Sequence, residues 1–251
     1  LYRYETRGIW VEKVVGMKAA PEFREILAAV MLRRTLADIA LDIPEVTWGV
    51  KTLDAKDVLL GSRAPSNLQV AVVNGTPLSE LLMDPAVARY RRNVGLAKAP
   101  AVVQTLAEEL EETFEGAQEK VVVFAHHTAV LHLLRDGLAP FGVAFVDGSI
   151  TGTKRDAEIA RFQTDPTCRV FVGQNIACQN SITLTAARRV IIVEPDWAAN
   201  VNYQLGQRIA RIGSTFQGCV GQMIALADTL DEAIVRQHVR ETQMAQDMFG
   251  G

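Results

Sequence analysis

The chain has 251 residues, of which 49% are hydrophobic and 22% charged, and its formal net charge is −3. A chain of this length and composition can bury a full α/β core, which excludes a disordered protein. The slight negative charge excludes nucleic-acid binding through overall charge, so any such binding must come from a local patch. No apolar run reaches the roughly 18 residues that span a bilayer, and no signal segment opens the sequence, so we expect a cytoplasmic protein without a membrane partner.

The first hundred residues predict a mostly helical segment. Apolar residues at helical intervals predict an amphipathic helix within residues 21–44, and the apolar alternation around Trp48 predicts a strand. A second helix is expected from about Leu78 to Asn93, and a third from about Pro100 to Thr113. We therefore expect helices ahead of the main folded lobe.

From residue 120 onward, apolar runs typical of buried strands alternate with helical patterns. Strands are expected at 120–125, 143–146, 169–173 and 190–193, and helices at about 130–138, 153–162 and 231–248. This alternation predicts an α/β fold with a parallel sheet covered on both faces. Such sheets bind their ligands at the carboxyl ends of the strands.

A pair of arginines stands out near the carboxyl end, where residues 202–213 read NYQLGQRIARIG. Residues three or four apart share one side of a helix, so Gln204, Arg208 and Arg211 are expected to point across one cleft. Arginine stays charged and can donate two hydrogen bonds to a transferring phosphoryl group. An isolated arginine pair is more often a solvated helix face, so this interpretation depends on further motifs.

Several motifs occur together in the order of one family. The arginine string resembles the sixth motif of superfamily 2 helicases in its Swi/Snf variant, Gln-x-x-x-Arg-x-x-Arg-Ile-Gly-Gln. KVVVFAHH from Lys120 resembles the fourth motif, Asp147-Gly148-Ser149 resembles the loop after the next strand, and residues 176–187 stand where the fifth motif is expected. Met-Leu-Arg-Arg-Thr within residues 21–44 resembles the linker between the two ATPase lobes.

The resemblance implies a RecA-like α/β lobe over residues 95–251, preceded by a helical protrusion and linker over residues 1–94, with the boundary near Val94. It implies the second motor lobe of a DNA-dependent ATPase, a helicase or translocase. Arg208 and Arg211 would stabilise charge on the γ-phosphoryl group of ATP, and Gln204 would order the same cleft. Sequence-independent contacts to the DNA backbone are expected from strand-end loops and the following helix start, at His126, His127, Gly148, Ser149, Thr151 and Lys154.

What the chain lacks narrows this expectation. It contains no G-x-x-x-x-G-K-[ST] loop, so ATP and Mg²⁺ would be held mainly by a first ATPase lobe that precedes Leu1 in a longer protein. The acidic string around Asp231 and Glu232 could be taken for magnesium ligands, but Thr229 with Glu232 fits a helix capping box better. We expect a carboxyl-terminal piece that is inactive alone.

The motifs also depart from the family pattern. Ser214 replaces the final glutamine of the sixth motif. The usual glycines and asparagine of the fifth motif are replaced, which is closer to the annealing-helicase branch, at Cys178, Gln179, Ser181 and Thr183. The chain also ends soon after its last predicted helix, and a parent from a bacterium or a phage would account for this brevity.

The sequence predicts no metal site, and it leaves two alternative functions open. The dispersed Cys168, Cys178 and Cys219 predict small buried apolar residues, and the adjacent His126 and His127 point to opposite sides of an extended chain, so no metal site is expected. The alternatives are a lobe of another superfamily 2 helicase, of the restriction or RNA type, and a non-catalytic domain that uses this fold for protein or nucleic-acid contact.

Overall fold

The protein is described by a computed structural model that covers residues 2–6, 9–13, 22, 25–26, 29–30, 43–54, 64, 84–112, 119–179 and 182–249. It forms two compact units, one of residues 42–239 and one of residues 1–41 with 240–251. In the smaller unit, β1 (Tyr2–Thr6) and β2 (Ile9–Lys13) pair antiparallel. The helix predicted within residues 21–44 lies largely outside the described residues, as does Ser181.

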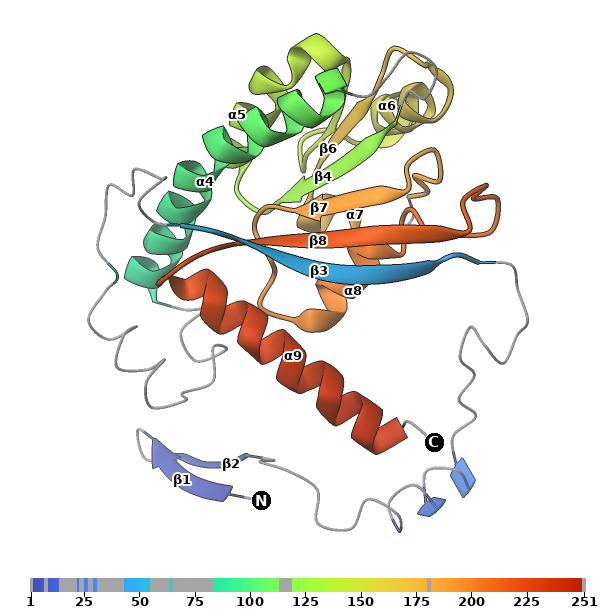
Figure 1. Ribbon diagram of the computed structural model, residues 1–251. Helices are drawn as coiled ribbons and strands as arrows, with labels where there is room; N and C mark the ends of the chain where they lie inside the picture. Colours follow the sequence, from blue (N-terminus) through green and yellow to red (C-terminus); the bar gives the residue numbers. More distant parts are fainter. Residues whose placement is uncertain are drawn as a thin grey trace. The chain divides into compact units, whose positions relative to one another are not determined.

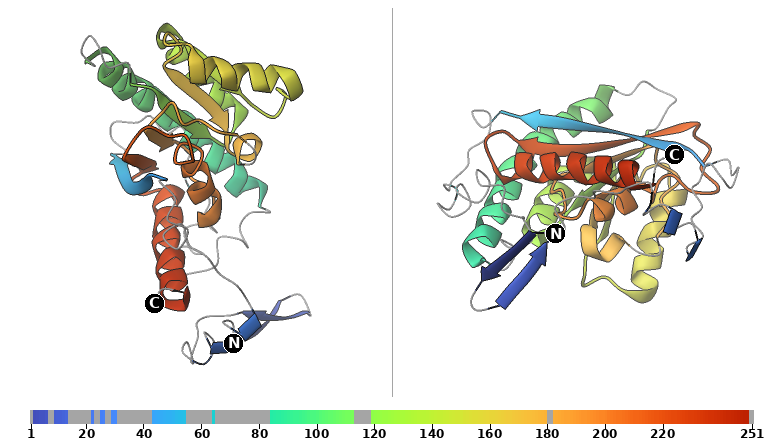
Figure 2. Two further views of the ribbon diagram at one scale, coloured as in Figure 1. Left: turned by 90° about the vertical axis from the view of Figure 1, so that its right-hand side faces the viewer. Right: turned by 90° about the horizontal axis from the view of Figure 1, so that it is seen from below.

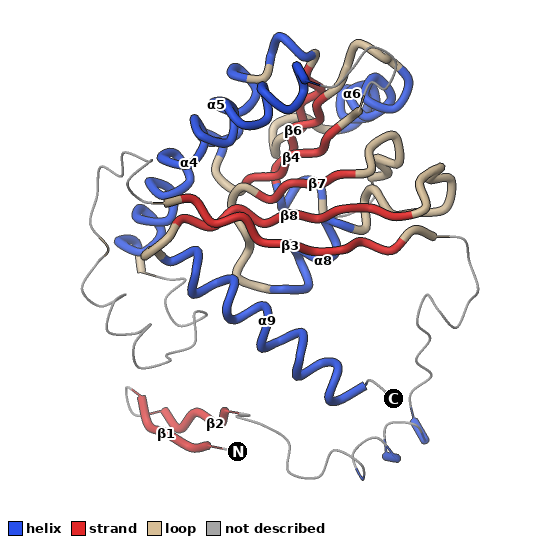
Figure 3. The backbone as a smooth tube through the Cα atoms, viewed as in Figure 1, coloured by secondary structure: helices blue, strands red, loops and turns tan. Residues whose placement is uncertain are grey.

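The larger unit is built on a six-stranded sheet in the order β3-β8-β7-β4-β6-β5 (Figure 1). Every pair of neighbouring strands in it is parallel. The strands are β3 (Glu45–Leu53), β4 (Val121–Ala125), β5 (Val143–Val146), β6 (Val170–Gln174), β7 (Arg189–Ile192) and β8 (Gly218–Leu226). The predicted parallel α/β sheet is confirmed, and Figure 3 shows its strands in red. Because all neighbouring strands are parallel, their carboxyl ends meet at one edge.

Helices cover both faces of this sheet (Figures 1 and 2). The central strand β4 is buried on both sides, so alternate residues enter different cores. Val121, Val123 and Ala125 pack with α4 and α5, whereas Val122 and Phe124 pack with residues of α6, α7 and α8. The helices are α4 (Pro85–Glu112), α5 (Thr128–Gly137), α6 (Gly152–Thr164), α7 (Asn175–Cys178), α8 (Ala199–Gly206) and α9 (Leu230–Phe249), with a 3-10 turn at Ala139–Phe141.

Helix α4 differs from its prediction. Two helices were expected, ending near Asn93 and starting near Pro100, but one helix runs through both and contains Pro100. Proline within a helix costs about 3 kcal/mol, and α4 offsets this by burying apolar residues along its length, Val94 and Leu106 among them. The chain therefore has no break at the boundary placed near Val94. The division into residues 1–94 and 95–251 stays a prediction about the longer protein.

The strand predicted around Trp48 is β3, and it belongs to the lobe rather than to a preceding segment. Its pairing with β8 was not predicted, although the two strands pair along nine residues. The indole of Trp48 fits against two glycines of the lobe. A Cβ atom on Gly206 would lie 2.4 Å from Trp48 Cζ2, and one on Gly221 would lie 2.6 Å from Trp48 Cε3. Trp48 thereby packs against the end of α8, where the arginine motif continues.

This contact gives a stability prediction. Gly206→Ala should lower the free energy of unfolding by roughly 1–3 kcal/mol, because the methyl group must displace a rigid indole ring. The matched control is Gly218→Ala, since a Cβ there meets nothing within 4 Å. The control should change stability by no more than about 0.5 kcal/mol. Urea unfolding followed by circular dichroism measures both, and equal values for the two variants would contradict the packing argument.

Three further predictions concern the cysteines, the start of α9 and membrane spans. Cys168, Cys178 and Cys219 are free and buried, as expected, and burial raises the pKa of Cys178 to about 12. Thr229 Oγ1 accepts a hydrogen bond from the Asp231 N–H (3.3 Å) at the start of α9, so Thr229 caps this helix, whereas the reciprocal contact with Glu232 in the expected capping box stays a prediction. Within the described part of the chain, no helix is long and apolar enough to cross a membrane.

Candidate functional site

The arginine motif is not one continuous helix. Helix α8 ends at Gly206, so Gln204 is helical and exposed, whereas Arg208 and Arg211 lie in the turns that follow. We call residues 207–213 the arginine turn. The helix cannot continue here, because the Arg208 carbonyl accepts a hydrogen bond from the Leu184 N–H (2.8 Å). The turn then closes at Gly213, whose φ of +93° favours glycine.

Both arginines nevertheless reach the same neighbouring segment. Arg208 Nη2 donates to the carbonyl of Gln179 (2.7 Å), and Arg211 Nη1 donates to Thr183 Oγ1 (3.2 Å). Burial, and after it the charge of Arg211, lower the pKa of Arg208. Arginine remains protonated despite such a shift. Hydrogen bonds from the side chains of Arg208 and Arg211 therefore connect the sixth motif to the fifth.

The expected DNA contacts lie elsewhere, at the carboxyl edge of the sheet. Gln174, at the end of β6, connects two loops there: its Oε1 accepts from the Gly148 N–H (2.9 Å), and its Nε2 donates to the His126 carbonyl (3.1 Å). Asp147 Oδ1 accepts from both the N–H (2.9 Å) and the Oγ–H (2.6 Å) of Ser149. Burial raises the pKa of Asp147, but these bonds outweigh it and the pKa is lowered. The Asp-Gly-Ser loop is thus fixed from within.

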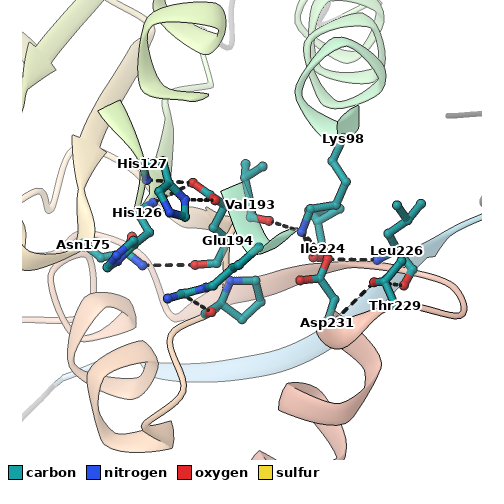
Figure 4. Close-up of polar contacts among 12 residues, drawn as sticks. Lys98, His126, His127, Asn175, Val193, Glu194, Ile224, Leu226, Thr229 and Asp231 are labelled. Atoms are coloured by element: carbon teal, nitrogen blue, oxygen red, sulfur yellow. Dashed lines mark hydrogen bonds and ion pairs between the residues drawn. The ribbon is translucent and has the colours of Figure 1, made fainter. Parts of the chain in front are cut away.

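Glu194 organises the loop after β4. It is 3% exposed, and its Oε2 accepts hydrogen bonds from the N–H groups of His126 and His127 (2.9 Å each). Its Oε1 lies 2.6 Å from His127 Nδ1 (Figure 4). Burial favours the neutral form of this carboxyl, but the hydrogen bonds from His127 outweigh burial and the pKa of Glu194 is lowered. The two backbone N–H groups expected to meet DNA phosphates are therefore already occupied.

The backbone around Glu194 is fixed by side chains from two elements, α4 and α7. From α4, Lys98 Nζ donates to the Val193 carbonyl (2.5 Å) and Arg91 Nη2 to that of Pro195 (2.9 Å), and from α7, Asn175 Nδ2 donates to that of Glu194 (3.1 Å). Figure 4 shows the contacts of Lys98 and Asn175 with the segment after β7. Three successive carbonyls thus have side-chain partners, so the position of the Glu194 carboxylate is strongly determined.

The remaining predicted residues lie at the start of α6. Thr151 is the residue before the helix, and Thr151 and Lys154 are both exposed. The structure therefore brings the sequence-predicted residues together in two groups. Gln204, Arg208 and Arg211 form one group with the fifth motif, and the strand-end loops with the start of α6 form the other.

His126 gives a prediction for stability against pH. Burial, then the charges of Arg91 and His127, lower its pKa from the ordinary 6.5 to about 4. Between these two values the unfolded chain binds a proton that the folded chain does not, so the free energy of unfolding should fall as pH drops from 6.5 towards 4. His126→Asn removes this contribution. Urea unfolding at several pH values should show a flatter pH dependence for the variant, and parallel curves would contradict a buried neutral His126.

The sequence is similar to that of several known proteins. A family model described as "Helicase conserved C-terminal domain" matches residues 101–214. A fly protein named "SWI/SNF-related matrix-associated actin-dependent regulator of chromatin subfamily A-like protein 1" is 27% identical over 192 residues, which is 74% of this chain and 24% of that protein. Residues 101–214 thus match a helicase C-terminal domain, and the chain is similar to a protein of the Swi/Snf family.

Other similarities extend over most of this chain. A cattle protein named "DNA annealing helicase and endonuclease ZRANB3" is 24% identical and covers 94% of this chain, which matches 22% of that protein. The solved structure of the C-terminal part of the Fun30 ATPase domain superposes with a TM-score of 0.50 at 22% identity, covering 67% of this chain and 52% of that one, and supports the fold. The chain matches about a quarter of the length of each of these two curated relatives.

The relatives also correct one expectation. They come from fly and cattle, and their printed names refer to chromatin and to DNA annealing. The prediction of a cytoplasmic protein from a bacterium or a phage is therefore wrong. The cytoplasmic location was inferred from the lack of a membrane span and of a signal segment, and the bacterial or phage origin from how soon the chain ends after its last helix. Neither feature identifies a cellular compartment or an organism.

Sequence reasoning missed the residues that hold the site in place. Gln174 ends the strand β6, and Glu194 lies two residues after β7, positions where a polar residue indicates a ligand or a strand-end contact. That signal was present for both, but it could not name their partners. Lys98 gave no signal, because lysine is almost never fully buried unless it is paired.

Proposed function

We propose that this chain is the second motor lobe of a Swi/Snf-type DNA-dependent ATPase, and that Arg208 and Arg211 act on the γ-phosphoryl group of ATP. The arginine turn carries this proposal. Its two guanidinium groups are fixed to a neighbouring loop, and preorganised cations stabilise charge that develops in a transition state without a cost of reorganisation at that moment. Gln204, exposed at the end of α8, orders the same cleft.

The other ATP contacts come from a partner. ATP and Mg²⁺ are held mainly by a first ATPase lobe, which supplies the phosphate-binding loop and the magnesium ligands. The present chain supplies Arg208 and Arg211 when it closes on the first ATPase lobe. Arg211 suits that role because its guanidinium is only partly buried, so it can approach a nucleotide that the partner holds.

DNA is bound through its backbone and without base readout. The exposed Ser149, Thr151 and Lys154 lie where the strand-end loops meet the start of α6, and His126, His127 and Gly148 shape that edge. Hydroxyl and ammonium groups of this kind contact phosphates and carry no sequence information. With a net charge of −3, the isolated chain should bind DNA weakly and with a strong dependence on salt.

ATP hydrolysis by the chain joined to a Swi/Snf first lobe tests the proposal. We expect hydrolysis that rises when duplex DNA is added, and none from this chain alone. Hydrolysis that DNA does not stimulate would contradict the DNA-dependent motor. A joined protein that binds DNA but does not hydrolyse ATP would favour a non-catalytic domain.

A further inference from the structure

The contact between Glu194 and His127 determines which protonation states this histidine can adopt. The carboxylate of Glu194 is buried and ionised, and its Oε1 lies 2.6 Å from His127 Nδ1. An ionised carboxylate only accepts hydrogen bonds, so Nδ1 must carry the proton. In neutral His127, the other ring nitrogen, Nε2, is therefore an acceptor.

Nε2 is the part of His127 that remains for a ligand. The His127 side chain is 22% exposed. Some side-chain atoms of the described residues are buried without a hydrogen-bond partner, but His127 Nε2 does not belong to them. The ring lines a cavity of about 200 Å³ together with Arg91, His126, Asp196 and Trp197. A phosphate oxygen accepts hydrogen bonds, so it cannot bind the lone pair of neutral Nε2. It can bind Nε2 only when the ring is the doubly protonated imidazolium.

His126 is suited to a different role. Its Nδ1 is buried without a hydrogen-bond partner, and its backbone is held by Glu194 and Gln174. The depressed pKa of about 4 keeps the His126 ring neutral near pH 7. Both adjacent histidines were predicted to contact DNA. In the structure the His126 ring is enclosed, whereas Nε2 of His127 remains accessible.

We propose that His127 binds a DNA backbone phosphate through Nε2, and only as the imidazolium, with Glu194 as the positioning residue that sets its tautomer and balances its charge. This rests on the proposed function, because it assumes that DNA lies at the carboxyl edge of the sheet. It adds which of the two histidines binds, through which atom and in which charge state. Binding should therefore take up a proton.

The charged groups around His127 are compatible with this role. Glu194 and Asp196 face it from the segment after β7, Arg91 faces it from α4, and His126 precedes it. Arg91 is already bonded to the Pro195 carbonyl and lies over the Trp197 ring, 5.2 Å from its centroid. The backbone N–H groups of His126 and His127 hold Oε2 of Glu194, and this places its Oε1 at Nδ1 of the His127 ring. Histidine is the side chain that ordinarily changes charge between about pH 5 and 8.

Duplex DNA binding by the full 251-residue chain at low salt, followed by fluorescence anisotropy from pH 6 to 8.5, tests this inference. The wild-type chain should lose about tenfold in affinity as pH rises, because one charge-assisted hydrogen bond is lost. The slope of log affinity against log salt should also become shallower by about 0.9. His127→Asn should bind weakly with no such pH dependence. His126→Asn, which changes the same edge, should keep the tenfold decrease in affinity between pH 6 and 8.5.

Glu194→Gln is the decisive variant. The glutamine oxygen can still accept from the two backbone N–H groups, and its NH₂ group then donates to Nδ1. Neutral His127 is thereby switched to the tautomer with a proton on Nε2, which can donate to phosphate at any pH. We expect affinity that is nearly constant from pH 6 to 8.5. A merely structural role for Glu194 would weaken binding equally at all pH values and keep the wild-type pH dependence.

Other outcomes separate the possible failures. A flat wild-type curve, or wild-type pH dependence in His127→Asn, overturns the inference and leaves the motor proposal intact. Loss of DNA-stimulated hydrolysis in the joined protein would instead overturn the proposed function. If a variant does not fold, ¹⁵N NMR of the wild-type imidazole still decides, because a proton on Nε2 rather than Nδ1 at pH 8.5 contradicts the inference.

Discussion

Arg211→Ala should reduce DNA-stimulated ATP hydrolysis of the joined protein by about a thousandfold, which is the usual cost of losing an arginine finger. The structure makes this the cleaner of the two arginine tests. Arg211 is partly exposed and donates to Thr183 Oγ1 (3.2 Å) and to the carbonyl of Gln207 (3.2 Å). Gln207 is itself only partly buried, so water can replace the lost donor. Stability should change by less than about 1 kcal/mol. Turnover under saturating ATP and DNA, with urea unfolding in parallel, measures both effects.

Arg208→Ala should give a comparable loss of hydrolysis together with a loss of stability. Arg208 is 7% exposed, and its removal leaves the Gln179 carbonyl without its donor. An unsatisfied buried acceptor costs about 1–3 kcal/mol. Lysine at either position keeps the charge but not the forked donor geometry, so Arg211→Lys should remain strongly impaired.

Arg236→Ala is the matched control, because Arg236 is an exposed arginine paired with Glu232 on α9. It should hydrolyse ATP like the wild type. If Arg211→Ala retained as much activity as this control, the arginine turn would have no role in hydrolysis and the motor proposal would lose its main support.

Lys98→Met should be the most destabilising single change, at about 3–5 kcal/mol. Lys98 is fully buried, and its Nζ lies 2.5 Å from Asp231 Oδ2 while also donating to the carbonyls of Val193 (2.5 Å) and Ile224 (2.9 Å). Removing one partner of a buried ion pair leaves the other charge uncompensated. Methionine fills a similar volume, so the loss reports the charge and hydrogen bonds rather than a cavity. Urea unfolding measures it.

The double variant Lys98→Met, Asp231→Asn separates the ion pair from other effects. Asparagine removes the stranded charge and can still accept from the Leu226 N–H, as Asp231 Oδ2 does (3.1 Å). We expect the double variant to be more stable than Lys98→Met alone, with a coupling of about 0.5–3 kcal/mol. Additive losses in the two single variants would mean that the pair is not energetically coupled.

The fold was largely predictable because it depends on local patterns. Alternating apolar runs and helical periods predicted β4 to β7 with α5 and α6, and each is a short segment whose burial shows in its own composition. The pairing of β3 with β8 was missed. These strands are more than 160 residues apart in the chain, and nothing in either run specifies the other. Helix α4 was divided in two because local propensity at Pro100 counted for more than the burial that stabilises the whole helix.

The candidate site divides in the same way. The sequence alone determined which residues could carry the chemistry: Arg208 and Arg211 belong to a motif whose residue types and spacing are visible in twelve letters. Only the tertiary structure decided that the arginines follow α8 rather than lie in it, and that Glu194 occupies the backbone donors of His126 and His127. The physical reason is that hydrogen bonds satisfy buried groups across the fold. A donor is available to a ligand only if no distant residue has already taken it.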